Sequence, residues 1–219
     1  MIVQIYGVTT AEDAVLVEAL RPDNVGVVLD EGVDTWDSVD EPTTRAIVRE
    51  LSSTTVVALS LSTELDRIRR TVETVEPGVV HLARAVGGVG VDGVAAIREA
   101  VAPIEVMVTI PVRGAEAVDD AKAFASVSDF LLLDTAHPET GVVGASGHTH
   151  DWSWSRAVVE AVDVPVLLAG GLGPENVRDA IDQVRPAGVD SETRTSREGD
   201  RRRKDPDKVR RFIELARRE

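Results

Sequence analysis

Short runs of branched aliphatic residues alternate along the chain with stretches in which apolar residues recur every three or four positions. A short apolar run is typical of a strand buried on both faces, and the longer period is typical of a helix with one apolar face. The pattern predicts strands at 2–6, 24–29, 54–60, 78–82, 104–110, 129–134, 166–169 and 187–190. It predicts helices near 11–20, 42–51, 62–75, 92–101, 115–125, 153–162, 174–184 and 206–218.

Eight successive strand–helix pairs predict right-handed parallel units, and this number favours a closed (β/α)₈ TIM barrel over an open sheet. The 219 residues suit one such domain spanning 1–219, near the short end of the range for the fold. The polar stretch 191–205 is the exception to the pattern, and we expect it to form a long, mobile loop after the eighth strand. It contains five arginines, at positions 194, 197, 201, 202 and 203.

Acidic residues outnumber basic ones by 38 to 24, which gives a formal net charge of -14. Lysine occurs only at positions 122, 204 and 208. Dense carboxylates suit concentrated salt, where screening weakens their mutual repulsion. The balance predicts a halophilic protein with an acidic surface, with an ordinary acidic mesophilic protein as the alternative. It also argues against nucleic acid as a partner, because a phosphate backbone would be repelled.

The chain has no cysteine, which excludes disulfides and thiolate chemistry. Its start lacks a basic region followed by a cleavage pattern, and no apolar run reaches membrane-spanning length. We therefore expect a cytoplasmic protein without membrane contact, either a monomer or a homodimer.

Ligands of such barrels bind where the strands end, so the residues at those positions are the first candidates. The seventh strand runs into Gly170 and Gly171, and Pro174 then opens a helix beside Asn176. Glycines allow close approach of the backbone, and a helix start offers free N–H groups to an anion. We expect a phosphate site at this turn, with a tight turn that binds no ligand as the alternative.

Asp134 closes an apolar strand, where a carboxyl with a raised pKa suits a general acid. A loop-ordering aspartate is the plainer interpretation. His81 ends the fourth strand and either faces the barrel mouth or caps the core. The loop histidines His137, His148 and His150 suggest a metal-dependent enzyme as a minor hypothesis, against a polar lid with exposed histidines.

Several motifs, in order along the chain, resemble one family of barrel enzymes. They are the opening Gln4-Ile5-Tyr6-Gly7-Val8-Thr9, the stretch Leu132-Leu133-Asp134-Thr135, the loop from Gly144 to Trp152, the turn Leu168-Ala169-Gly170-Gly171-Leu172 followed by Pro174-Glu175-Asn176-Val177, and finally Gly188-Val189-Asp190 and Lys204-Asp205-Pro206. Together they resemble the phosphoribosylanthranilate isomerases of tryptophan biosynthesis over nearly the whole chain.

The resemblance implies an Amadori-type rearrangement of an aminoaldose phosphate, in which an aspartate protonates the furanose ring oxygen and a cysteine removes the C2′ proton. The aspartate corresponds to Asp134, but Tyr6 stands in place of the cysteine. Asp37 lies in the stretch where the family grips the anthranilate carboxylate with an arginine. In place of the family's phosphate loop stand Glu192, Thr193 and Arg194.

These departures predict an isomerase of a phosphorylated sugar derivative with altered substrate or reduced activity, and without a cofactor. Its base would be His81, His148, Asp30 or an activated Tyr6. Thr193 and Arg194 would assist at the phosphate, and Arg194 would bind it through its side chain. The alternative is a paralogue without catalysis that binds a phosphorylated metabolite or a protein.

Overall fold

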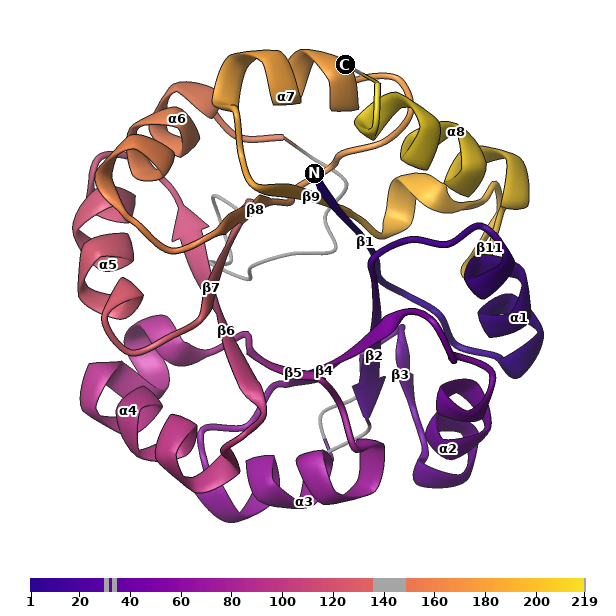
Figure 1. The fold of residues 1–219 in the computed structure, drawn as a ribbon, viewed down its shortest axis with the longest axis horizontal. Coiled ribbons are helices and arrows are strands. Elements are labelled where there is room, and N and C mark those ends of the chain that lie inside the picture. Colours follow the sequence, from indigo (N-terminus) through magenta and orange to yellow (C-terminus); the bar gives the residue numbers. More distant parts are fainter. Residues whose placement is uncertain (30–31, 33–34, 136–148, 219) are drawn as a thin grey trace.

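Eight parallel strands close into a barrel inside a ring of helices (Figure 1). The computed structural model describes residues 1–29, 32, 35–135 and 149–218. Each barrel strand pairs with the next, and β1 pairs with both β2 and β9, which closes the sheet. The barrel strands are β1 (Ile2–Ile5), β2 (Asn24–Leu29), β4 (Thr55–Ser60), β5 (Val79–Leu82), β6 (Glu105–Val112), β7 (Phe130–Thr135), β8 (Val166–Leu168) and β9 (Gly188–Ser191). The (β/α)₈ barrel expected from the sequence is thus confirmed.

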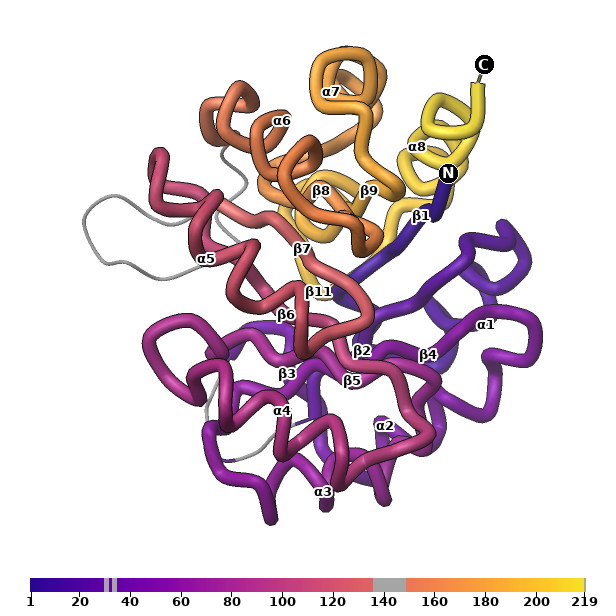
Figure 2. The backbone as a smooth tube through the Cα atoms, turned by 60° about the vertical axis from the view of Figure 1, so that its left-hand side comes forward, coloured from indigo at the N-terminus to yellow at the C-terminus, as the bar shows by residue number. Residues whose placement is uncertain are grey.

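The helices follow the strands in the predicted order and cover the outside of the barrel (Figures 1 and 2). Thr10 and Asp205 cap two of them: the Thr10 hydroxyl accepts from Asp13 N, and the Asp205 carboxylate accepts from Asp207 N and Lys208 N. The helices are α1 (Ala11–Ala19), α2 (Glu41–Arg49), α3 (Leu65–Val75), α4 (Gly90–Val101), α5 (Glu116–Ala125), α6 (Trp152–Ala161), α7 (Val177–Val184) and α8 (Pro206–Ala216). No helix among the described residues is both long and apolar enough to cross a membrane.

Alternate residues of each strand supply two separate apolar layers. One set, including Val3 and Ile5 of β1, packs against the helices in the main core. The other set fills the barrel itself with Val57, Met107, Leu132 and Leu167 and neighbouring side chains. Burial on both faces explains the nearly continuous aliphatic runs in the sequence. The barrel interior is therefore solid below the mouth, and ligand chemistry is confined to its ends.

Tyr6 belongs to this inner layer, since its side chain is only 4% exposed and packs among the barrel-filling residues. Its ring lies directly over Gly26 of β2, where a Cβ atom would come within 2.1 Å of two ring carbons. A residue larger than glycine at position 26 would exclude the ring. The tyrosine and the glycine are thus matched in size.

The structure differs from the sequence-based expectation in three main places. α7 begins at Val177 instead of 174, because the Asn176 side chain accepts from Gly173 N and donates to Gly171 O, which holds Pro174 in a turn before the helix. Segment 191–205, expected to be a mobile loop, contains a 3₁₀ turn and an antiparallel pair, β10 (Ser196–Arg197) with β11 (Asp200–Lys204). It is held by Lys204, whose side chain is fully buried. A further short strand, β3 (Ser38–Val39), pairs in parallel with the end of β2.

We expect Gly26→Ala to destabilise the protein by about 1–3 kcal/mol, the usual cost of an extra methyl group in a filled core. In a Tyr6→Ala background the same substitution should cost little, because the ring it would strike is gone. Urea unfolding of the four proteins in this cycle gives the coupling free energy directly. Equal costs in both backgrounds would show that the two residues are not matched.

Candidate functional site at the carboxyl ends of the strands

Tyr6 and His81 are brought together inside the barrel mouth. The Tyr6 hydroxyl lies 2.7 Å from His81 Nδ1, and His81 Nε2 lies 2.6 Å from the Thr109 hydroxyl. Burial lowers the pKa of His81 to about 3. Burial is the main cause that raises the pKa of Tyr6 well above 10. The nearby carboxyls of Asp190, Glu192 and Asp37 raise it further. Both groups are therefore neutral at pH 7. The imidazole tautomer decides whether Tyr6 donates to His81 and His81 to Thr109, or whether both hydrogen bonds run in the opposite direction.

Asp134 lies at the mouth near the end of β7, and the residue is partly exposed. One carboxylate oxygen accepts from Thr135 N at 2.7 Å. Burial raises the pKa of Asp134 to about 7, and this hydrogen bond opposes the shift. A carboxyl that titrates near neutral pH can act as a general acid.

The glycine turn after β8 lies against Asp134. Gly170 and Gly171 both have positive φ angles, of 86° and 63°. A Cβ atom on Gly170 would come within 2.3 Å of the Thr135 hydroxyl and 3.2 Å of an Asp134 oxygen. The N–H groups of Gly171 and Leu172 have no hydrogen-bond partner within the described part of the chain. Glycine at position 170 is thus required by both its backbone angle and the closeness of the acid.

A small cavity at this turn joins the ends of β7, β8 and β9. Asp134, Gly170, Gly171, Asp190 and Glu192 line it, together with Leu172 and Thr193. The cavity contains three carboxyl groups, which is an unusual lining for a phosphate site. Burial and the charge of Asp134 raise the pKa of Asp190 to about 8, so its carboxyl is largely protonated at pH 7.

Glu192 and Asp37 form a carboxyl pair beside this cavity. Burial, together with the charge and hydrogen bond of Asp37, raises the pKa of Glu192 well above its ordinary value. Lys204 lies next to the pair, where burial lowers its pKa to about 8. Its ammonium group donates to the Glu192 carbonyl oxygen at 2.7 Å and to the hydroxyls of Thr195 and Ser196, each at 3.3 Å. The hydrogen bonds of the Lys204 ammonium group thus hold the loop that follows β9.

Other predicted site residues lie apart from this cluster. Arg194 is exposed and pairs with Glu175 at 3.1 Å, and it does not line the cavity. The Asn176 side chain bonds backbone atoms of the turn. His150 links Thr135 to Ser155, and burial lowers its pKa to about 4. Asp30, His137 and His148 lie outside the described residues. Within the described ranges, no group of three or more histidine or acidic side chains is arranged to hold a metal ion.

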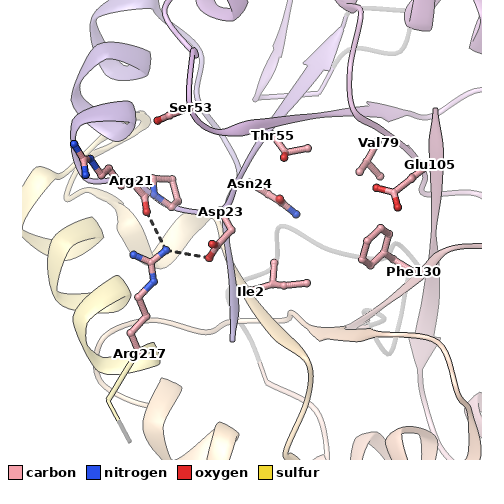
Figure 3. A pocket seen from close by; sticks show the side chains of 11 residues that line it. Ile2, Arg21, Asp23, Asn24, Ser53, Thr55, Val79, Glu105, Phe130 and Arg217 are labelled. Carbon is pink, nitrogen blue, oxygen red and sulfur yellow. Dashed lines mark hydrogen bonds and ion pairs between the residues drawn. The ribbon is translucent and has the colours of Figure 1, made fainter. Parts of the chain in front are cut away.

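A larger hollow, of about 830 Å³, lies at the opposite end of the barrel (Figure 3). Ile2, Asn24, Val79, Glu105 and Phe130 line it around the strand starts. Arg217 closes one side by donating to Arg21 O at 2.9 Å and to an Asp23 oxygen at 3.0 Å.

Sequence reasoning did not single out Asp190 or Lys204 as members of the site. Asp190 follows a strand in the same way as Asp134, so its position was a usable signal. Lys204 lies 12 residues beyond Glu192, which follows β9, and nothing in the local pattern brings it back to the mouth. Only the β10–β11 pair does that.

The fold and site define a (β/α)₈ barrel with a carboxyl-rich site at the carboxyl ends of its strands. Residues 3–215 match the family model described as N-(5′-phosphoribosyl)anthranilate (PRA) isomerase. The chain therefore belongs to the phosphoribosylanthranilate isomerase family, as the motifs indicated.

Named relatives agree with this assignment. The chain is 35% identical over 219 residues to the N-(5′-phosphoribosyl)anthranilate isomerase of Haloferax volcanii, covering 98% of this chain and 92% of the relative. The crystal structure of the phosphoribosyl anthranilate isomerase from Thermotoga maritima superposes with a TM-score of 0.81 at 29% identity, covering 98% and 97% of the two chains. These similarities do not favour the alternative of a binding protein without catalysis. The halophile relative agrees in part with the expectation from the acidic composition.

Stability should fall as pH rises through the range in which Asp134 and Asp190 ionise. The folded pKa values of about 7 and about 8 exceed the ordinary 3.8, so the folded state holds protons that the unfolded chain has already released. Their stabilising contribution is complete below about pH 4 and is lost as pH rises through 7 to 8. We expect Asp190→Asn, which stays neutral, to raise Tm by about 2–4 °C at pH 9, equivalent to about 1 kcal/mol, and by much less at pH 5.

Thermal melts across pH measure this difference. Asp163→Asn, which removes an exposed carboxyl before β8, serves as the control and should show no such dependence. A gain from Asp190→Asn that is equal at both pH values would mean that Asp190 is ionised in the folded protein at neutral pH.

Proposed function

We propose that this protein is an aldose–ketose isomerase that acts on a phosphorylated sugar derivative at the carboxyl-terminal mouth of the barrel. Its family membership supports the reaction class. The observation that carries the proposal is the setting of Asp134, a partly exposed carboxyl with a pKa of about 7, fixed beside the glycine turn. An Amadori-type rearrangement requires an acid at the furanose ring oxygen, and Asp134 suits that role. The proposed chemistry is proton transfer alone and requires no cofactor.

The phosphate of the substrate would bind at the turn formed by Gly170 and Gly171. There the N–H groups of Gly171 and Leu172 have no partner among the described residues and could donate to it. Asn176 would act by holding the turn, and Thr193 would line the opposite wall. The neighbouring carboxyls oppose a dianion unless they are protonated. The raised pKa values of Asp190 and Glu192 make that state accessible at neutral pH. We therefore expect phosphate affinity at this turn to fall as pH rises above about 8.

Activity toward phosphoribosylanthranilate itself should be low. Tyr6 and His81 are bound to each other, and neither ionises near pH 7. The pKa of Tyr6 is too high and the pKa of His81 is too low for either group to remove the C2′ proton efficiently at neutral pH. Asp37 adds a carboxyl where an anthranilate carboxylate would need a cation. Asp30 and His148 stay candidates for the base. We further propose a cytoplasmic location, with the protein a monomer or homodimer.

We expect Asp134→Asn to lower kcat about 10²- to 10⁴-fold, because the amide cannot protonate the ring oxygen. The activity of the unmodified protein should fall as pH rises through about 7, as Asp134 loses its proton. Both are measured by following isomerisation of phosphoribosylanthranilate in concentrated KCl. Asp163→Asn, at the far end of β8, controls for the loss of one carboxyl.

The same assay tests the view that Tyr6 limits the reaction. The Tyr6→Cys/Asp37→Arg variant should gain turnover, whereas Tyr6→Phe, which retains the ring but loses its hydroxyl, should not. Turnover by the unmodified protein that Tyr6→Phe abolishes would assign Tyr6 as the base. Activity unaffected by Asp134→Asn would falsify the proposed acid.

A further inference from the structure

The arginines of segment 191–205 divide into two groups with different surroundings. Three of them hold β11 to the barrel. Arg201 stacks on the Trp36 ring at 4.8 Å, and Arg202 donates to the carbonyl oxygen of Trp36. Arg203 pairs with buried Asp13 at 3.0 Å. Arg201, Arg202 and Arg203 are therefore structural groups. The other two arginines of the segment are Arg194 and Arg197.

Arg194 and Arg197 line a hollow of about 570 Å³ on the flank of the barrel, where the turn before α7 meets β10 and the start of α8. Two further cations, Lys208 and Arg211, enter it from α8. Its charged lining is thus four cationic groups against two carboxylates, those of Glu175 and Glu198. The local charge of the hollow is therefore positive, whereas the net charge of the chain is -14. A local positive field in such a protein attracts anions to one place.

The cationic groups are positioned but still have donors to offer. Arg197 Nε donates to Lys204 O at 3.1 Å, which leaves its terminal nitrogens. Lys208 Nζ donates to Ser196 O at 3.1 Å and retains two N–H groups. Arg211 has no hydrogen bond or ion pair within the described residues. Arg194, by contrast, is paired with Glu175. Arg197, Lys208 and Arg211 are therefore the groups able to bind an added anion.

We propose that this flank hollow is a phosphate-binding site for a small phosphorylated metabolite. Guanidinium groups form paired hydrogen bonds with phosphate oxygens, and an excess of positive charge suits a phosphate monoester dianion. The volume exceeds that of an inorganic phosphate ion and is in the usual range for small-molecule ligands. Thr193 lines both this hollow and the acidic cavity at the mouth, but the hollow does not depend on the proposed isomerase function.

Titration calorimetry at low salt with inorganic phosphate and with ribose 5-phosphate tests the site. We expect Arg211→Glu to weaken binding of both at least about tenfold, and Arg197→Glu/Arg211→Glu to weaken it further. Arg210→Glu is the matched control. It is the adjacent residue on α8, it pairs with Asp207 outside the hollow, and its loss should change affinity less than about twofold.

Phosphate binding that is unchanged in the double variant overturns the site and leaves the glycine turn as the phosphate site, so the proposed isomerase function would stand. No binding of either probe to the unmodified protein also overturns it. Thermal melts of each variant establish that it is folded.

Two sources of the phosphate are distinguished by the same titrations. Competition between ribose 5-phosphate and inorganic phosphate for a site that Arg211→Glu weakens would identify the hollow with a sugar phosphate ligand. Simultaneous binding, with the second site insensitive to Arg211→Glu, would identify the hollow with a separate phosphorylated effector. Both outcomes support an anion site at Arg197 and Arg211.

Discussion

Closure of the sheet by β1 is the constraint on which the rest of the structure depends. Because β1 pairs with both β2 and β9, the carboxyl ends of β1, β5, β7 and β9 face one another across a single mouth. Residues separated by more than fifty positions thereby share one environment. Tyr6 touches His81, and Asp134 shares a cavity with Asp190. An open sheet of the same strands would leave these groups apart.

Burial of carboxyl groups determines the electrostatics of that mouth. Asp37, Asp134, Asp190 and Glu192 lie close together, and the nearby Lys204 is held by loop oxygens. The interior cannot keep so many like charges ionised, because both desolvation and mutual repulsion disfavour them. Asp134 and Asp190 therefore hold protons near neutral pH. This makes the mouth suited to acid chemistry and a costly place for a phosphate dianion.

Tyr6 depends on two other residues of the barrel interior. A tyrosine at position 6 needs an empty place on β2 and a polar partner for its hydroxyl, and Gly26 and His81 supply them. The three residues form one unit that fills the barrel below the mouth.

The sequence by itself determined the barrel, the order of its elements and the position of Asp134, since apolar periodicity and strand ends are local properties of the chain. Only the tertiary structure decided which ends meet. It paired Tyr6 with His81, brought Lys204 back to the mouth through β11, and divided the arginines of 191–205 between structural contacts and the flank hollow. The pKa of a buried group depends on all its neighbours in space, and sequence spacing does not report those neighbours.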